Sequence, residues 1–152
     1  MRLNNKILWV FFFLMPLLVV NTNKISASET DDYAPEITAK VSRISYLTGN
    51  VKIRRANGDD WERAVLNLPI IEGDEIAADS NALLEIQFDR DNYVRLAQNS
   101  YLKILNLKDE GVALSLSQGS LNVTVLDFDK DEKYFEIDAP ETTVSILREG
   151  IY

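Results

Sequence analysis

Apolar and polar residues alternate along most of the chain after Lys40. The pattern is clearest in "ALLEIQF", "VALSLSQ" and "SLNVTVL", where every second residue is apolar. A period of two places successive side chains on opposite faces of a β-strand, so that one face is dry and the other wet. We therefore predict a core that includes Leu84, Ile86, Phe88, Leu114, Leu116, Val123 and Ile137, with Glu85, Gln87, Ser115 and Asn122 exposed.

Turn signals separate these alternating runs. The segments "DRDN", "KDEG", "SQG" and "DKDEK" follow one another at intervals of roughly ten residues, which is typical of an all-β sandwich, barrel or solenoid. Asn57-Gly58 predicts a β-hairpin, because both residues tolerate a positive φ. No stretch after residue 40 has a convincing helical period. The predicted fold class is therefore all-β, with many short strands.

The N-terminal segment has the layout of a secretory signal. Arg2 and Lys6 precede an apolar run over residues 7–20, and the small residues Ser26, Ala27 and Ser28 follow it. The run is shorter than the roughly 17 residues that a transmembrane helix needs. We predict a signal peptide over 1–28, cut after Ala27 or Ser28, and export to the periplasm or cell envelope. The alternative is an uncleaved membrane anchor.

The rest of the chain divides into two parts. Residues 29–39 are acidic and lack periodicity, which predicts a flexible leader, and residues 40–152 form the β domain. The sequence stops at "REGIY", where Ile151 and Tyr152 resemble the start of a further strand. We expect the domain to be truncated at its C-terminal end, with this last strand exposed and without a partner.

Composition narrows the possible chemistry. The chain has no histidine and no cysteine, so no Ser-His-Asp triad, Cys-His pair or His-ligated metal can be built. Removal of residues 1–28 leaves 13 basic residues against 24 acidic ones, and a domain of this charge repels nucleic acid and anionic lipids. We predict no cofactor and no nucleic-acid partner, and membrane contact only through the N-terminal segment if it is uncleaved.

The order of the strands and turns resembles the FecR-like domain of bacterial exported and periplasmic proteins. The resemblance covers about residues 40–152. The matching pieces are Gly73-Asp74, the strand at 84–88, the turn at 89–92, the strand at 94–96, Asn99-Ser100, "LSLSQGSLNVTV" around Gly119, and "YFEIDAP" ending at Pro140. The resemblance implies short strands stacked in a solenoid-like or sandwich-like arrangement.

The chain departs from the family pattern in three places. Asp91-Asn92 replaces an Asp-Gly turn, and Ala139 replaces a threonine before Pro140. The segment "REG" at 148–150 replaces "RGT". This last change points to signal-peptide-bearing FecR-like proteins of unassigned function rather than to signalling regulators of the iron-citrate type.

Two acidic segments are candidate sites. Glu72, Asp74, Glu75 and Asp79 lie close together, either as catalytic carboxylates or as a turn in which Gly73 and Asp74 shape the backbone, and we favour the turn. Residues 127–138 begin with the acid spacing of a calcium loop. They lack its glycine and final glutamate, so we favour a solvated hairpin.

Aromatic residues supply a third candidate. Trp61, Tyr93, Tyr101 and Tyr134 could form a platform on which sugars stack. The tyrosines occupy the outward phase of their strands, whereas we expect Trp61, between a turn and Val65-Leu66, to take a core role.

These observations favour an exported, non-enzymatic domain that binds an envelope or periplasmic protein in a sensing or scaffolding role. We predict no catalytic, cofactor-binding or metal-binding residue. The alternatives are a polysaccharide-binding module of the cell envelope and a carboxylate-based glycan hydrolase.

Overall fold

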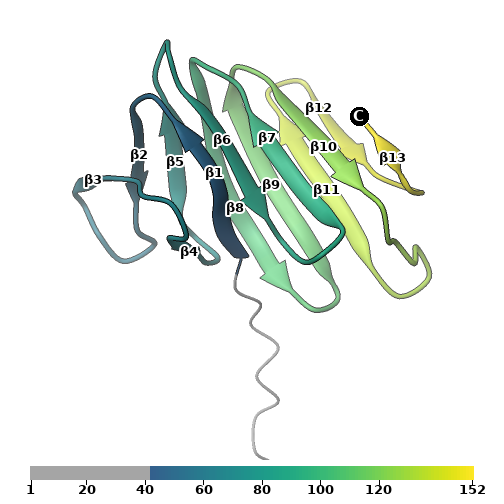
Figure 1. Cartoon of the computed structure of the whole chain (residues 1–152). Coiled ribbons are helices and arrows are strands. Elements are labelled where there is room, and N and C mark those ends of the chain that lie inside the picture. The colour runs from purple at the N-terminus through teal and green to yellow at the C-terminus, as the bar shows by residue number, and fades with distance from the viewer. Residues whose placement is uncertain (1–41) are drawn as a thin grey trace, which may run out of the picture. The chain divides into compact units, whose positions relative to one another are not determined.

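The computed structural model describes residues 42–152, which form strands joined by turns and loops (Figure 1). The predicted signal peptide (1–28) and leader (29–39) lie outside the described residues, so both stay predictions. Residues 42–152 contain no helix that is long and apolar enough to cross a membrane. The prediction of an all-β fold is confirmed.

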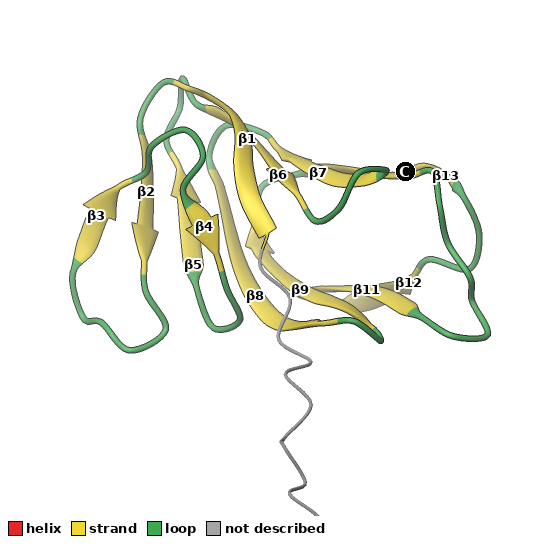
Figure 2. Ribbon diagram, turned by 60° about the horizontal axis from the view of Figure 1, so that its bottom comes forward, coloured by secondary structure: helices red, strands yellow, loops and turns green. Residues whose placement is uncertain are grey.

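The strands form two sheets that face one another (Figure 2). The six-stranded sheet has the order β13 (Gly150–Ile151), β10 (Leu121–Val125), β7 (Asn92–Leu96), β6 (Leu83–Gln87), β1 (Ser42–Thr48) and β4 (Pro69–Ile70). The seven-stranded sheet has the order β12 (Thr142–Ser145), β11 (Tyr134–Ala139), β9 (Gly111–Gln118), β8 (Ser100–Lys108), β5 (Glu75–Ala78), β2 (Val51–Arg54) and β3 (Trp61–Arg63).

The chain winds from one sheet to the other as it advances. It crosses between sheets from β4 to β5 to β6, and again from β9 to β10 to β11. Four hairpins, β2–β3, β6–β7, β8–β9 and β11–β12, stay within one sheet. After β9 the chain passes through β10 in the other sheet and then returns as β11. β9 and β11 therefore lie next to each other in the seven-stranded sheet, where they pair in parallel. The fold thus combines the predicted solenoid-like winding with a sandwich.

This winding gives the sandwich two different ends. β3 and β4, consecutive in the chain, are the edge strands of the two sheets at one end, and β12 and β13 are the edge strands at the other. Figure 1 shows the chain progressing from the first end to the second. We call them the β3–β4 end and the β12–β13 end. Each end presents a strand edge on both sheets.

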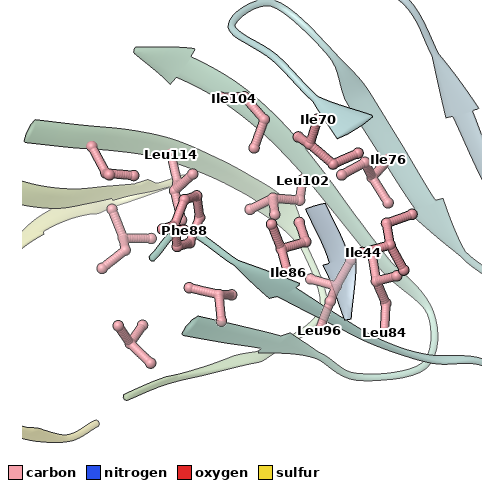
Figure 3. Close-up of a cluster of buried hydrophobic side chains, with 14 of the residues drawn as sticks. Ile44, Ile70, Ile76, Leu84, Ile86, Phe88, Leu96, Leu102, Ile104 and Leu114 are labelled. Atoms are coloured by element: carbon pink, nitrogen blue, oxygen red, sulfur yellow. The ribbon is translucent and has the colours of Figure 1, made fainter. Parts of the chain in front are cut away.

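The core fills the space between the sheets, and Figure 3 shows its side chains converging from both of them. Six of the seven predicted core residues are buried: Leu84, Ile86, Phe88, Leu114, Val123 and Ile137. Leu116 is half-buried and packs against the core. The residues predicted to be exposed, Glu85, Gln87, Ser115 and Asn122, are half-buried on the outer faces. The predicted strand phase is therefore confirmed.

Two predictions about connections and edges are wrong. The acidic segment after β10 is not a hairpin loop, because β10 and β11 belong to different sheets. The last strand also has a partner. Val123 N donates to Tyr152 O (3.0 Å) and Tyr152 N donates to Val123 O (2.9 Å), so β13 extends the six-stranded sheet beside β10.

Asn92 explains one of the departures from the FecR-like pattern. It is the first residue of β7, directly after the β6–β7 turn, and is buried. Its Nδ2 donates to Asp89 Oδ2 (2.9 Å) and to Asp127 O (3.0 Å), and its Oδ1 accepts from Leu126 N (3.1 Å). An asparagine at this position therefore ties the turn to the segment that leaves β10, which a glycine has no side chain to do.

Candidate binding surfaces

Asp74, the centre of the first acidic segment, is a buried structural residue. Its Oδ2 accepts from Arg55 Nη1 (2.9 Å) and Ile71 N (3.0 Å), and its Oδ1 accepts from Ala56 N (3.3 Å). Gly73 precedes it at φ 87°, and a Cβ there would lie 2.6 Å from the Cβ of Ala56. The turn is confirmed, and Arg55 is a basic partner that the sequence pattern did not predict.

Glu75, the next acid, belongs to a cluster on the outer face of the seven-stranded sheet. Its carboxylate accepts hydrogen bonds from Tyr101 Oη and Arg54 Nη2, and Lys103 Nζ lies 3.3 Å from Oε1. The Tyr101 hydroxyl and the Arg54 guanidinium hold the pKa of Glu75 at about 2, well below its usual value of 4.5. The pKa of Tyr101 is raised, through its burial and its hydrogen bond to Glu75. Glu75 therefore stays ionised at neutral pH.

Trp61 lies over this cluster rather than in the core, so the prediction of a core role is wrong. The Cζ atom of Arg54 lies 5.0 Å from the centroid of the Trp61 ring, within the range of a cation–π contact. The Trp61 ring also meets the Tyr101 ring edge-on, with centroids 5.9 Å apart. Trp61 is 37% exposed. The predicted hairpin is confirmed as β2–β3, but its connection runs over residues 55–60 and neither Asn57 nor Gly58 has a positive φ. The hairpin places Trp61 directly opposite Arg54.

The cluster is part of a basic patch formed by two rows of outward residues. One row is Trp61, Arg54, Glu75 and Lys103, and the next is Arg63, Lys52, Ala77 and Tyr101. We define the basic patch as Lys52, Arg54, Arg63 and Lys103 with the two rings. It carries four cations and encloses one carboxylate, Glu75, between Arg54 and Lys103, although the whole chain has a formal net charge of −8.

Lys52 and Arg63 differ from the other two cations of the basic patch. They lie directly opposite each other across the β2–β3 pair, and both are exposed. Arg54 and Lys103 each have Glu75 as an ion-pair partner, whereas over residues 42–152 no ion pair involves Lys52 or Arg63. Like charges directly opposite each other on adjacent strands are destabilising. The positive charges of Lys52 and Arg63 are therefore available to an anionic ligand.

A polar groove adjoins the patch at Ala77 and Tyr101. It has a volume of about 450 Å³, and its polar lining residues are Asp79, Ser80, Asn99, Ser100, Tyr101 and Gln118. Asp79 is held by Asn50 Nδ2, and Gln118 Nε2 donates to Asn99 O (3.2 Å). The groove is therefore lined by hydrogen-bond donors and acceptors whose positions are partly set by contacts within the protein.

An apolar cleft of about 310 Å³ opens between the sheets at the β12–β13 end. Leu116, Leu121, Val123, Ile137, Val144 and Tyr152 are among its lining residues. Val144 pairs with the buried Ile137 and therefore has the inward phase, yet it is 44% exposed. Tyr152 hydrogen-bonds Val123 within the six-stranded sheet, which faces Val144 across the cleft, and it is 46% exposed. The core thus reaches the surface at this end.

The edges beside this cleft add further apolar surface. Leu147 is 69% exposed and Ile151 is 71% exposed, one between β12 and β13 and the other on β13. In the part of the chain that the structure describes, no strand pairs with the outer edge of β12 or of β13. An extended segment could therefore hydrogen-bond to either edge while its apolar side chains enter the cleft.

The aromatic residues singled out in the sequence do not form one platform. Trp61 and Tyr101 contact each other, whereas Tyr93 lies on the six-stranded sheet, where Arg95 Cζ is 4.9 Å from its ring centroid. Tyr134 lies on β11, away from Tyr101 on β8 in the same sheet. Lys52 and Arg63 were not predicted as site residues from the sequence. The Asn57-Gly58 pair was the available signal. If the two strands of a hairpin are paired outward from these two residues, Lys52 comes to lie opposite Arg63.

The second acidic segment provides turns rather than an evident ion site. Asp129 Oδ1 accepts from Asp131 N (2.9 Å), and its carbonyl accepts from Lys133 N (2.8 Å). Residues 42–152 contain no group of three or more acidic side chains placed to hold a metal ion.

Comparison of the chain with family models, curated proteins and solved structures gives no match. The likeness to FecR-like domains therefore rests on the sequence pattern described above.

Proposed function

We propose that this chain is an exported, non-enzymatic domain of the FecR-like type that binds another protein of the cell envelope, in a sensing or scaffolding role. The apolar cleft at the β12–β13 end is the observation that carries this proposal. Export is proposed from the signal-like layout of residues 1–28.

The character of the cleft supports a protein as the partner. Its inward residues Val123, Ile137 and Val144 are aliphatic, and within residues 42–152 no strand pairs with the outer edges of β12 and β13 beside it. A peptide that adds a strand to such an edge gains affinity from main-chain hydrogen bonds and specificity from alternate side chains. We propose an extended segment of the partner, with apolar residues at every second position, as the occupant.

The carboxylate-hydrolase alternative finds less support in these residues. A glycosidase needs one carboxyl group that is protonated near neutral pH. The pKa of Glu75 is about 2, and Asp74 is buried in an ion pair with Arg55. Glu75 is therefore not suited to the role of a general acid, and Asp74 is fully buried and does not reach a substrate, so the proposal remains a binding domain.

Affinity capture with a matched pair of variants tests the proposal. The tagged full chain is incubated with envelope extract, beside Val144→Lys and Val65→Lys. Both valines are exposed, at 44% and 53%, but Val65 lies between β3 and β4 at the opposite end. We expect a protein retained by the wild type and by Val65→Lys, and lost with Val144→Lys. Equal retention by all three would contradict the proposal.

A further inference from the structure

We propose that the basic patch and the adjoining polar groove bind an acidic polysaccharide, meaning a glycan that carries a carboxylate on many of its sugars. This site lies on the outer face of the seven-stranded sheet, towards the β3–β4 end, and is separate from the apolar cleft. The proposal does not depend on the proposed protein-binding function.

Charge is the first argument for an anionic ligand. Lys52 and Arg63 face each other without a carboxylate partner among residues 42–152, and Arg54 and Lys103 add two further cations that share Glu75. The net negative charge of the chain does not prevent binding at this site. At physiological ionic strength charges separated by more than about 8 Å are largely screened, so the nearest cations dominate at contact.

The groove and the rings are the argument for a sugar. Sugar hydroxyls donate and accept hydrogen bonds, and the groove offers an acceptor carboxylate at Asp79, a hydroxyl at Ser80 and amides at Asn99 and Gln118. Trp61 is partly exposed, and Tyr101 lines both the patch and the groove. An aromatic ring presents an apolar face to the C–H groups of a sugar.

The surface suits a glycan better than an acidic peptide. The outward side chain at the centre of the second row is the small Ala77, which lies between Lys52 and Tyr101 and lines the groove. A chain of sugars can therefore lie across the sheet, with its carboxylates near Lys52 and Arg63 and its hydroxyls in the groove. An acidic peptide would form ion pairs with the cations, but it would leave many hydrogen-bond donors and acceptors of the groove without a partner.

The test is a titration of the full chain with oligogalacturonate, a glycan with one carboxylate per sugar. Dextran of the same length is the neutral control, and polyglutamate is the non-sugar polyanion. We expect binding of oligogalacturonate, at least tenfold weaker binding of dextran and polyglutamate, and weakening by added salt. Failure of oligogalacturonate to bind would overturn the proposal. Polyglutamate binding as tightly would also overturn it, because charge alone would then explain the affinity.

Variants locate the site. Lys52→Ala should weaken oligogalacturonate binding about two- to fivefold, the range of one exposed ion pair. Lys133→Ala removes the same charge from the loop before β11 and should leave the affinity unchanged. The double variant Lys52→Glu/Arg63→Glu should lose measurable binding, with its melting temperature measured to check folding. An equal effect of Lys133→Ala and Lys52→Ala would overturn the assignment, whatever the double variant does.

Discussion

Val144 lies directly opposite Ile137 in the β11–β12 pair, yet Val144 is 44% exposed and Ile137 is 5% exposed. Directly paired residues share a face of the sheet, so both side chains have the inward phase. The difference arises because β12 is the edge strand, where the cleft leaves the inner face open. This contrast is the structural basis for a binding surface at the β12–β13 end.

The same contrast predicts unequal stability effects. Ile137→Ala removes buried contacts and should cost about 2–5 kcal/mol of unfolding free energy. Val144→Ala should cost less than about 1 kcal/mol, because much of that side chain is already in water. Denaturant titrations of both variants give the comparison. Equal losses would show that β12 is covered in the free protein.

A second prediction concerns the centre of the sandwich. Ile86 is fully buried between the sheets, so Ile86→Ala should cost about 2–5 kcal/mol. Ser115 is half-buried on an outer face, and Ser115→Ala should change stability by about 0.5 kcal/mol or less. The measurement is again a denaturant titration, and a larger loss for Ser115→Ala would contradict the strand phase.

The alternation of Leu84, Ile86 and Phe88 was enough to predict this phase, because the period of two is a local property. The partners of each strand are non-local. The acidic segment after β10 looks like a hairpin turn, yet it crosses between the sheets. Tyr46 is 53% exposed, although it belongs to the apolar residues around the first strand, because a bulge between Ile44 and Tyr46 shifts the pairing.

In the candidate sites too, local features could be predicted from the sequence and contacts between distant segments could not. The turn role of Asp74 could be predicted from Gly73-Asp74, since it depends on neighbouring backbone. Its ion pair with Arg55 depends on how separate segments pack and could not be predicted. The Trp61 strand has only three residues and no alternation, so the pattern gave no information on its phase. The cleft between β11–β12 and β10–β13 could not be predicted either, because it depends on which strands lie at the edges of the two sheets.

A third prediction concerns the corner between β1 and β2. Gly49 has φ 73°, and a Cβ there would lie 2.2 Å from the carbonyl oxygen of Asn81. Gly49→Ala should therefore cost well over about 1 kcal/mol. Gly58 is the matched control, because its nearest neighbour would be the Cβ of Arg55 at 3.6 Å. Thermal unfolding should show a lower midpoint for Gly49→Ala and little change for Gly58→Ala. Equal midpoints would contradict the corner geometry.

A fourth prediction concerns pH. Folding lowers the pKa of Glu75 from 4.5 to about 2, so the ionised group stabilises the fold at pH values above 4.5. This contribution is lost as the pH falls from 4.5 through 2. Glu75→Gln should therefore be less stable than the wild type at pH 7, and the difference should shrink over that interval. Denaturant titrations at several pH values measure it, and a difference independent of pH would contradict the role of the charge.

Site-specific photo-crosslinking in living cells tests the proposed binding at the β12–β13 end most directly. A photoreactive amino acid is placed at position 144, in the mouth of the cleft, or at position 46, where Tyr46 is similarly exposed but lies on β1. We expect a covalent adduct with another envelope protein from position 144 and none from position 46. No protein adduct from position 144, or equal yields of the same adduct from both positions, would contradict it.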